Sequence, residues 1–262
     1  MKTIYHYTSL SGFEAIIKSK YIRLTNSLIS NDKKEINWVM DLLMEMYPDR
    51  LSEILKIKTV FEIALKNYYK PHLACFSLDP DQLSQWRGYG NDGKGVSIGF
   101  NMDYFEKIKR IENREFVIGR IVYNKLKQKK LLSQLIEREN IFQKFDSIDD
   151  YFRLILYCSG LVGLGIRIKH NSFKEEKEVR LIHGYEEIAA QSDIFEYYFT
   201  NDTLKTFIEI PLDIQKNSDN IINEIVLGPK CKVDPDLLGG FLDVNGFFSS
   251  KITIRKSCST YQ

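Results

Sequence analysis

Apolar residues recur along this chain with two different periods, one typical of strands and the other of helices. Residues 3–7 alternate as a short strand does, and Thr8 or Ser9 is a suitable N-cap for the helix that follows. Further runs of alternating, β-branched or aromatic residues predict strands around residues 21–24, 72–78, 95–100, 115–123, 178–183, 194–199, 205–210, 223–228 and 251–256.

Helical spacing dominates two longer regions between these strands. Apolar residues between about 35 and 69 predict two helices interrupted near Pro48, and residues 125–168 are predicted to be mostly helical. We found neither a repeat nor a low-complexity linker. The pattern therefore predicts one α+β domain over residues 1–262, with helical insertions at about 33–70 and 125–168.

Composition narrows the class of protein but not its function. The 262 residues carry a formal net charge of +2, which neither indicates nor excludes a nucleic-acid binder, because a basic face can exist within a near-neutral total. The four cysteines are far apart, with no Cys-x-x-Cys pair, which argues against a zinc site or a disulfide scaffold. The chain opens without a signal-peptide pattern, and its longest apolar stretch, 154–166, is too short to span a bilayer. These features predict a cytoplasmic protein without a membrane partner.

The stretch YHYTS at residues 5–9 is the first that suggests chemistry. Side chains alternate along a strand, so His6 is expected to face opposite to Tyr5 and Tyr7. An imidazole offers two nitrogens that bond ribose hydroxyls or backbone groups. The alternative is a core histidine bonded to a neighbouring carbonyl.

The second stretch, QWRGYGNDGKG at residues 85–95, is rich in turn-forming residues and is predicted to be a loop. Its aromatic side chains suit stacking on a flat heterocycle, and the fork of Arg87 suits phosphate oxygens. The alternative is a surface loop that Trp86 anchors to the core. The glycines match neither a P-loop nor a dinucleotide-binding motif.

The third stretch, FKEEKEVRLI at residues 173–182, concentrates charge at the start of a strand. If 176–182 is extended, Glu176, Glu178 and Arg180 share one sheet face with Ile182, while Val179 and Leu181 occupy the other. The alternative is a solvated run of charges.

Together the three stretches resemble a bacterial domain-of-unknown-function family whose genes are often found among abortive-infection and phage-defence loci. YHYTSLSGFEAIIKSKYIRLTN, ACFSLDPDQLSQWRGYGNDGKGVSIGF and FKEEKEVRLI carry this resemblance, in that order. That family is in turn similar, more distantly, to the ADP-ribosyltransferase superfamily, including DNA-thymidine ADP-ribosyltransferase toxins and RNA 2′-phosphotransferases. The resemblance implies a fold of split mixed and antiparallel sheets with NAD as a substrate.

The resemblance also implies roles for individual residues on the NAD side. His6 would take the place of the first motif and bind the adenosine-side ribose, with Tyr7 and Thr8 beside it. Tyr89 or Trp86 would stack near the nicotinamide.

The remaining roles fall on polar and charged side chains. Ser77 would be an alternative member of the middle motif. Glu178 would be the catalytic glutamate, with Glu176 in the preceding place of a Glu-x-Glu pair. Arg87 or Arg23 would hold the pyrophosphate. The chain departs from the superfamily in the long helical insertion between the first two motifs and in lacking a Ser-Thr-Ser triplet.

Three functions remain open at this point. The first is an ADP-ribosyltransferase, a glycosyltransferase acting as an intracellular toxin or defence effector on RNA (the favoured acceptor), DNA or protein, with an antitoxin or chaperone left open as a partner. The second is an NAD glycohydrolase that uses the same glutamate. The third is a non-catalytic module that binds a nucleotide or nucleic acid. A metal-dependent hydrolase has the least support, because the four histidines show no ligand spacing, and a Cys75 nucleophile is likewise unsupported.

Overall fold

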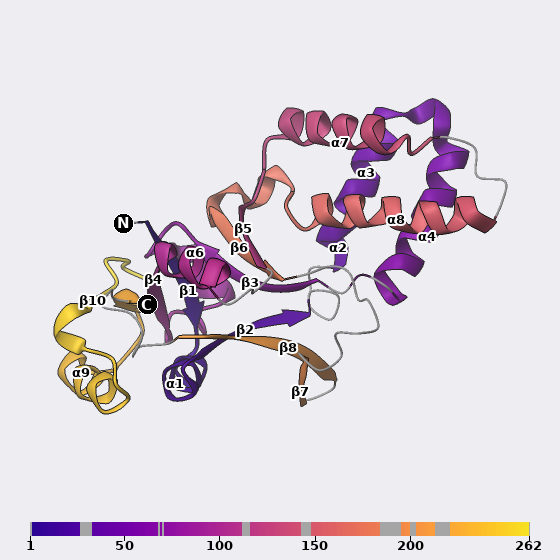
Figure 1. Cartoon of the computed structure of the whole chain (residues 1–262). Helices are drawn as coiled ribbons and strands as arrows, with labels where there is room; N and C mark the ends of the chain where they lie inside the picture. Colours follow the sequence, from indigo (N-terminus) through magenta and orange to yellow (C-terminus); the bar gives the residue numbers. More distant parts are fainter. Residues whose placement is uncertain are drawn as a thin grey trace.

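The computed structural model describes residues 2–26, 33–67, 69, 71–111, 116–142, 148–183, 195–199, 203–212 and 221–261 (Figure 1). The strands are β1 (Thr3–Thr8), β2 (Tyr21–Asn26), β3 (His72–Ser77), β4 (Val96–Asn101), β5 (Phe116–Arg120), β6 (Glu178–His183), β7 (Glu196–Phe199), β8 (Leu204–Pro211), β9 (Ile222–Leu227) and β10 (Thr253–Lys256). The α-helices are α1 (Leu10–Ser19), α2 (Lys33–Ile36), α3 (Trp38–Met46), α4 (Leu51–Asn67), α5 (Leu83–Gly88), α6 (Met102–Ile111), α7 (Lys125–Glu139), α8 (Ile148–Gly165) and α9 (Pro235–Val244). Short 3₁₀ turns occupy η2 (Pro48–Arg50), η3 (Asn171–Glu176) and η5 (Ser249–Lys251).

The described strands form one open mixed sheet of ten strands in the order β10-β9-β4-β1-β3-β2-β8-β7, with β6 and then β5 attached to β3. β10 pairs with β9 in parallel, while the other pairs are antiparallel. β3 is the branching strand of this sheet. One edge of β3 pairs with β6 along its whole length, and the other edge meets β1 only at Ser77 and β2 only at His72 and Leu73. The sheet therefore forks where β1 and β2 diverge from β3.

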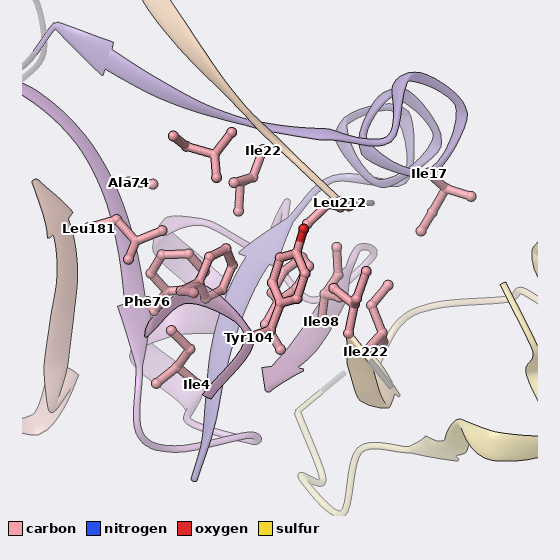
Figure 2. Packing of buried hydrophobic residues seen from close by; sticks show 14 of the residues in the cluster. Ile4, Ile17, Ile22, Ala74, Phe76, Ile98, Tyr104, Leu181, Leu212 and Ile222 are labelled. Atoms are coloured by element: carbon pink, nitrogen blue, oxygen red, sulfur yellow. The ribbon is translucent and has the colours of Figure 1, made fainter. Parts of the chain in front are cut away.

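The main core covers the sheet face that carries Ile4, Phe76 and Leu181. Figure 2 shows Phe76 packed with these two neighbours. Buried residues of α1, α6 and α9 join this core, including Ile17, which is fully buried. Alternation along each strand places every second side chain in this layer, so burial of these apolar side chains holds three helices on one face.

The two helical insertions, although distant in sequence, pack together as one helical lobe with a core of its own. Buried apolar residues of α2, α3, α4, α7 and α8 form this second core, which also takes in Leu73 and Ile182 from the sheet. Figure 1 shows α3, α4, α7 and α8 gathered at one end of the molecule, with α9 at the other. The lobe therefore contacts the sheet through β3 and β6.

The predicted α+β class is confirmed, as are the Ser9 N-cap and the break at Pro48. The predicted split into separate sheets is wrong for the described strands, because β3 joins both halves into one sheet. The predicted loop at 85–95 begins with α5, and the prediction missed α6 and α9. Parts of several predicted elements, at residues 68, 70, 115, 143–147 and 194, lie outside the described residues. In the described part of the chain, no helix has both the length and the apolar character that crossing a membrane requires.

Candidate active site

The strand register decides which of the predicted site residues share a face of the sheet. Tyr5 on β1 lies opposite Ser77 on β3, and Ser77 lies opposite Glu178 on β6. Residues directly opposite one another across a sheet point to the same face, so Tyr5, Ser77 and Glu178 form one row. His6 is displaced by one position and therefore points to the other face. The structure thus places the two principal predicted residues, His6 and Glu178, on opposite sides of the sheet.

Glu178 and Arg180 form a buried ion pair on the face opposite the main core. Arg180 Nε donates to Glu178 Oε1 at 2.6 Å and Nη2 donates to Oε2 at 3.0 Å, so the contact is bidentate. Glu178 is 6% and Arg180 1% exposed. The guanidinium also donates to the carbonyl of Ile166 and to Glu35 Oε2, each at 3.0 Å. The predicted alternative, a solvated run of charges, is therefore wrong for these two residues.

Lys169, which follows α8, adds a second cation to this pair. Its Nζ lies 2.6 Å from Glu176 Oε2, 2.8 Å from Glu35 Oε1 and 3.5 Å from Glu178 Oε2. The resulting acid–base cluster contains the carboxylates of Glu35, Glu176 and Glu178 and the cations of Lys169 and Arg180. With all five groups ionised, its net charge is −1.

Glu176 reaches the cluster by a different route from the predicted one. It is the last residue of η3, and Lys177, with φ of 47°, separates it from the start of β6. The expectation that Glu176 extends the strand is wrong, because the left-handed residue breaks the alternation. Ser77 fixes this turn: its hydroxyl donates to the carbonyl of Glu176 at 2.7 Å and accepts from Asp79 N.

The two neighbouring glutamates have pKa values displaced in opposite directions. Burial by itself would raise the pKa of Glu178, but the charges of Arg180 and Lys169 outweigh it and hold that pKa below 4.5. Burial raises the pKa of Glu176 above 4.5, and the neighbouring carboxylates of Glu178 and Glu35 add to this against the effect of Lys169. Such divergent pairs distinguish a permanently charged carboxylate from one suited to proton transfer.

Aromatic side chains surround the cluster. Tyr89, just after α5, is 55% exposed, and burial of its hydroxyl together with the Glu176 charge raises the pKa of Tyr89 to about 12. The ring centroid of Phe173, which is 43% exposed, lies 4.8 Å from Lys169 Nζ. The hydroxyl of Tyr123 accepts a hydrogen bond from Glu178 N at 3.0 Å. Two of these aromatic residues therefore offer exposed ring surface beside the carboxylates.

His6 lies in a different place, a cavity at the fork between β1, β2 and β3. This cavity has a volume of about 600 Å³ and is lined by His6, Thr8 and residues of α1, β2 and β3, with Lys18 and Arg23 among them. His6 Nδ1 bonds the carbonyl of Cys75 at 3.0 Å, and burial lowers the pKa of His6 so that the imidazole is neutral at pH 7. The predicted alternative of a carbonyl-bonded histidine is therefore confirmed for one of its nitrogens.

Cys75 connects the two places. Cys75 lines the fork cavity, and its thiol lies close enough to Glu178 to help lower the pKa of that carboxyl. The fork thus brings the cavity of His6 and the acid–base cluster to two sides of a single strand.

Other predicted site residues have structural contacts. The Tyr7 hydroxyl donates to the carbonyl of Asp79 and accepts from Gln82 N, and its ring meets that of Trp86 edge-on. Trp86 is fully buried and donates from Nε1 to Asp81, so its ring has no exposed surface for a ligand. Arg87 is exposed beside Tyr261, 5.9 Å from the ring centroid.

Sequence reasoning missed Glu35, Lys169 and Phe173 as site residues. Glu35 and Lys169 belong to the helical lobe, and neither stands in a motif that indicates a site. In the described part of the chain no group of three or more His, Cys, Asp or Glu residues is arranged to hold a metal ion.

Comparison with known proteins identifies a family that resembles part of the chain. A model of a family described as "Protein of unknown function (DUF2971)" matches residues 85–181, the segment from α5 to β6 that contains Tyr89, Lys169, Glu176 and Glu178. No curated protein and no solved structure matches the chain. The chain is therefore similar, over this segment, to a family described as being of unknown function.

Proposed function

We propose that this protein is an ADP-ribosyltransferase that uses NAD as its donor, with the acid–base cluster as the reaction site. The observation that carries the proposal is a pair of neighbouring glutamates with opposite pKa displacements, the buried Glu178 held ionised by Arg180 and the partly buried Glu176 poised for proton transfer. Tyr89 beside them provides an exposed ring on which nicotinamide stacks.

The reaction breaks the bond between the ribose C1′ and the pyridinium nitrogen of NAD. The bonding electrons leave with nicotinamide, which departs as a neutral molecule, and positive charge develops on the ribose as in glycoside cleavage. The fixed carboxylate of Glu178 stabilises this charge and accepts a hydrogen bond from the ribose 2′-hydroxyl. Glu176 takes the proton of the acceptor as the acceptor oxygen or nitrogen forms its bond to C1′.

The net charge of the cluster favours this chemistry over nucleic-acid binding at the same spot. Three carboxylates against two cations attract a cationic nicotinamide–ribose, whereas they lack the excess positive charge with which a non-catalytic module would hold a nucleic-acid backbone. A module that binds single strands through aromatic stacking and arginine contacts also could not use Trp86, because the Trp86 side chain is buried. Arg87 remains the candidate for the pyrophosphate, since Arg23 is paired with Glu209.

The fork cavity is the proposed site for the adenosine half of NAD, with His6 and Thr8 facing the ribose. Because Cys75 borders both the cavity and Glu178, a dinucleotide that reaches both passes the edge of β3 in the fork. The acceptor in this proposal is a macromolecule, with RNA favoured, and the biological role is that of a toxin or phage-defence effector.

Labelled NAD provides the test. Purified protein is incubated with NAD labelled in the adenylate phosphate and a bacterial extract, and both nicotinamide release and label in RNA, DNA and protein are measured. We expect label in a macromolecule, reduced by about 10²-fold or more in Glu178→Gln. Glu224→Gln is the matched control, because Glu224 pairs with Arg255 and Tyr5 on the same sheet face but outside the cluster. Nicotinamide release without labelled macromolecule would identify a glycohydrolase instead. No nicotinamide release, or equal activity in Glu178→Gln, contradicts the proposal.

A further inference from the structure

The backbone of Lys169 is fixed independently of the carboxylates that its side chain contacts. Ile168 forms a parallel bridge with Val122, and Lys169 N donates to the carbonyl of Val122 at 3.3 Å. The Lys169 carbonyl accepts from Nε2 of Gln128 at 2.8 Å, and Gln128 is itself buried. The ammonium is therefore held at the cluster by the segment that follows α8, which is bound to Val122 before α7 and to Gln128 within it, and not by the strand that carries Glu178.

The Lys169 ammonium has as many donors as it has carboxylate neighbours. An ammonium carries three N–H groups, and Glu35, Glu176 and Glu178 approach it from three different elements, α2, η3 and β6. Only 3% of Lys169 is exposed, so water competes little for these donors. The shortest of the three contacts, 2.6 Å, is the one to Glu176.

The two cations of the cluster are not equivalent for the two catalytic carboxylates. Arg180 binds Glu178 through two hydrogen bonds and also binds Glu35. The carboxylates of Glu178 and Glu35 therefore retain a bound cation if Lys169 is neutralised. Among the described residues, the cation within salt-bridge distance of Glu176 is Lys169. Removal of the Lys169 charge would leave Glu176 beside two carboxylates with no directly bound cation.

We propose that Lys169 is the positioning residue of the carboxylate pair: it orients the Glu176 carboxylate and keeps it ionised, so that Glu176 accepts the proton of the attacking group. The catalytic half of this inference rests on the function proposed above, while the electrostatic half concerns the cluster alone. The titratable groups that face Glu176 come from five parts of the chain, namely Glu35, Tyr89, Tyr123, Lys169 and Glu178. The tyrosines have raised pKa values and stay neutral, so Lys169 supplies the positive charge and the two carboxylates oppose it.

Titration of the Glu176 carboxyl group tests the electrostatic half without any substrate. The protein is labelled with ¹³C at glutamate side-chain carboxyls, and Glu176→Gln identifies the signal. An opposite charge this close shifts a carboxyl pKa by roughly one to three units, so we expect the midpoint to rise by that amount in Lys169→Met. The midpoint should return toward the wild-type value in Lys169→Arg, which restores the charge. An unchanged midpoint in Lys169→Met overturns the inference.

A double variant that keeps the net charge of the cluster tests the inference if Lys169→Met alone does not fold. Lys169→Met combined with Glu35→Gln removes one positive and one potential negative charge, so the cluster keeps its net charge. In this variant Glu176 still lacks its bound cation and faces Glu178, and its midpoint should stay above that of Glu35→Gln alone; equal midpoints contradict the inference.

Activity separates this inference from the proposed function. If NAD is cleaved, the acidic limb of the kcat profile should move to higher pH in Lys169→Met by the same number of units as the carboxyl midpoint. A moved midpoint without NAD cleavage in any variant, wild type included, rejects the proposed function and leaves the electrostatic role of Lys169 intact. NAD cleavage with an unchanged Glu176 midpoint in Lys169→Met supports the proposed function and rejects the electrostatic role of Lys169.

Discussion

His6 and Glu178 lie on opposite faces of one sheet, yet both are next to Cys75: the imidazole bonds its carbonyl, and its thiol helps to lower the pKa of the Glu178 carboxyl. The register Tyr5–Ser77–Glu178 fixes this arrangement, because His6 is one residue out of that row. The two residues therefore act on different parts of any ligand that both of them touch.

Substitution of these two residues should affect different kinetic parameters. His6→Ala removes a contact to the half of NAD remote from the reacting bond, so we expect KM for NAD to rise by about tenfold with kcat little changed. Glu178→Gln removes stabilisation of the developing cation and should lower kcat while leaving KM nearly unchanged. Initial rates of nicotinamide release over a range of NAD concentrations measure both. A loss of kcat in His6→Ala equal to that in Glu178→Gln would place the imidazole at the reacting bond and contradict the arrangement proposed here.

The Arg180 ion pair should matter greatly for stability. Arg180→Met leaves the buried Glu178 and the partly buried Glu35 with Lys169 as their remaining bound cation, and breaking a buried pair in this way costs about 3–5 kcal/mol. Urea unfolding of the variant and of wild type at neutral pH measures the difference. Arg23→Met is the control, because the Arg23–Glu209 pair is partly exposed and its loss should cost about 1 kcal/mol or less. Similar losses of unfolding free energy in Arg180→Met and Arg23→Met would show that the buried ion pair stabilises the fold no more than the partly exposed one.

Stability should respond to pH in opposite senses at Glu178 and Glu176. The folded-state pKa of Glu178 lies below its unfolded value of 4.5, so its ionised form stabilises the fold above that value, and this contribution disappears as the pH falls through the folded pKa. The folded-state pKa of Glu176 lies above 4.5, so its contribution is present at low pH and is lost as the pH rises through the folded pKa.

Unfolding free energies measured between about pH 3 and pH 7 test this pair of signs. The advantage of wild type over Glu178→Gln should shrink on acidification, whereas wild type should gain relative to Glu176→Gln on the same change. The same slope for both variants would contradict the opposite pKa displacements.

Tyr89 and Trp86 should be separable by substitution, although both were candidates for stacking on nicotinamide. Trp86→Phe disturbs a fully buried side chain and its bond to Asp81, so its main effect should be a loss of unfolding free energy of about 1–3 kcal/mol. Tyr89→Ala should leave stability within about 0.5 kcal/mol, because the side chain is largely exposed, but should weaken NAD binding. Thermal unfolding and titration with NAD distinguish the two effects. Unchanged NAD affinity in Tyr89→Ala would remove this tyrosine from the site.

The sequence predicts local structure here better than it predicts the site. Alternation and capping placed β1, its Ser9-capped helix and the Pro48 break, because each depends on residues close together in the chain. The same alternation correctly placed Glu178 and Arg180 on one face and Val179 and Leu181 on the other. The predicted strand at 178–183 matches β6, but its extension back to Glu176 was wrong, because Lys177 adopts a left-handed conformation that glycine or asparagine normally marks.

The relation between the predicted motifs depends on contacts that no local pattern encodes. Whether His6 and Glu178 share a face depends on the pairing of β1, β3 and β6, and a shift of one residue in either pairing would reverse the answer. Glu35 and Lys169 join the cluster only because two distant helical segments pack as one lobe against β3 and β6. Periodicity locates those helices but carries no signal for the polar residues at their ends.

That joint lobe has a consequence for the chain during its synthesis. When a ribosome has released only the segment up to α4, the apolar faces of α3 and α4 lack the α7 and α8 partners that cover them in the finished molecule. Lys169, Glu176 and Arg180 emerge later still, so the acid–base cluster can assemble only after all the residues that line the fork cavity have been made. Until α7 and α8 emerge, the uncovered apolar faces of α3 and α4 are the part of this fold most open to aggregation.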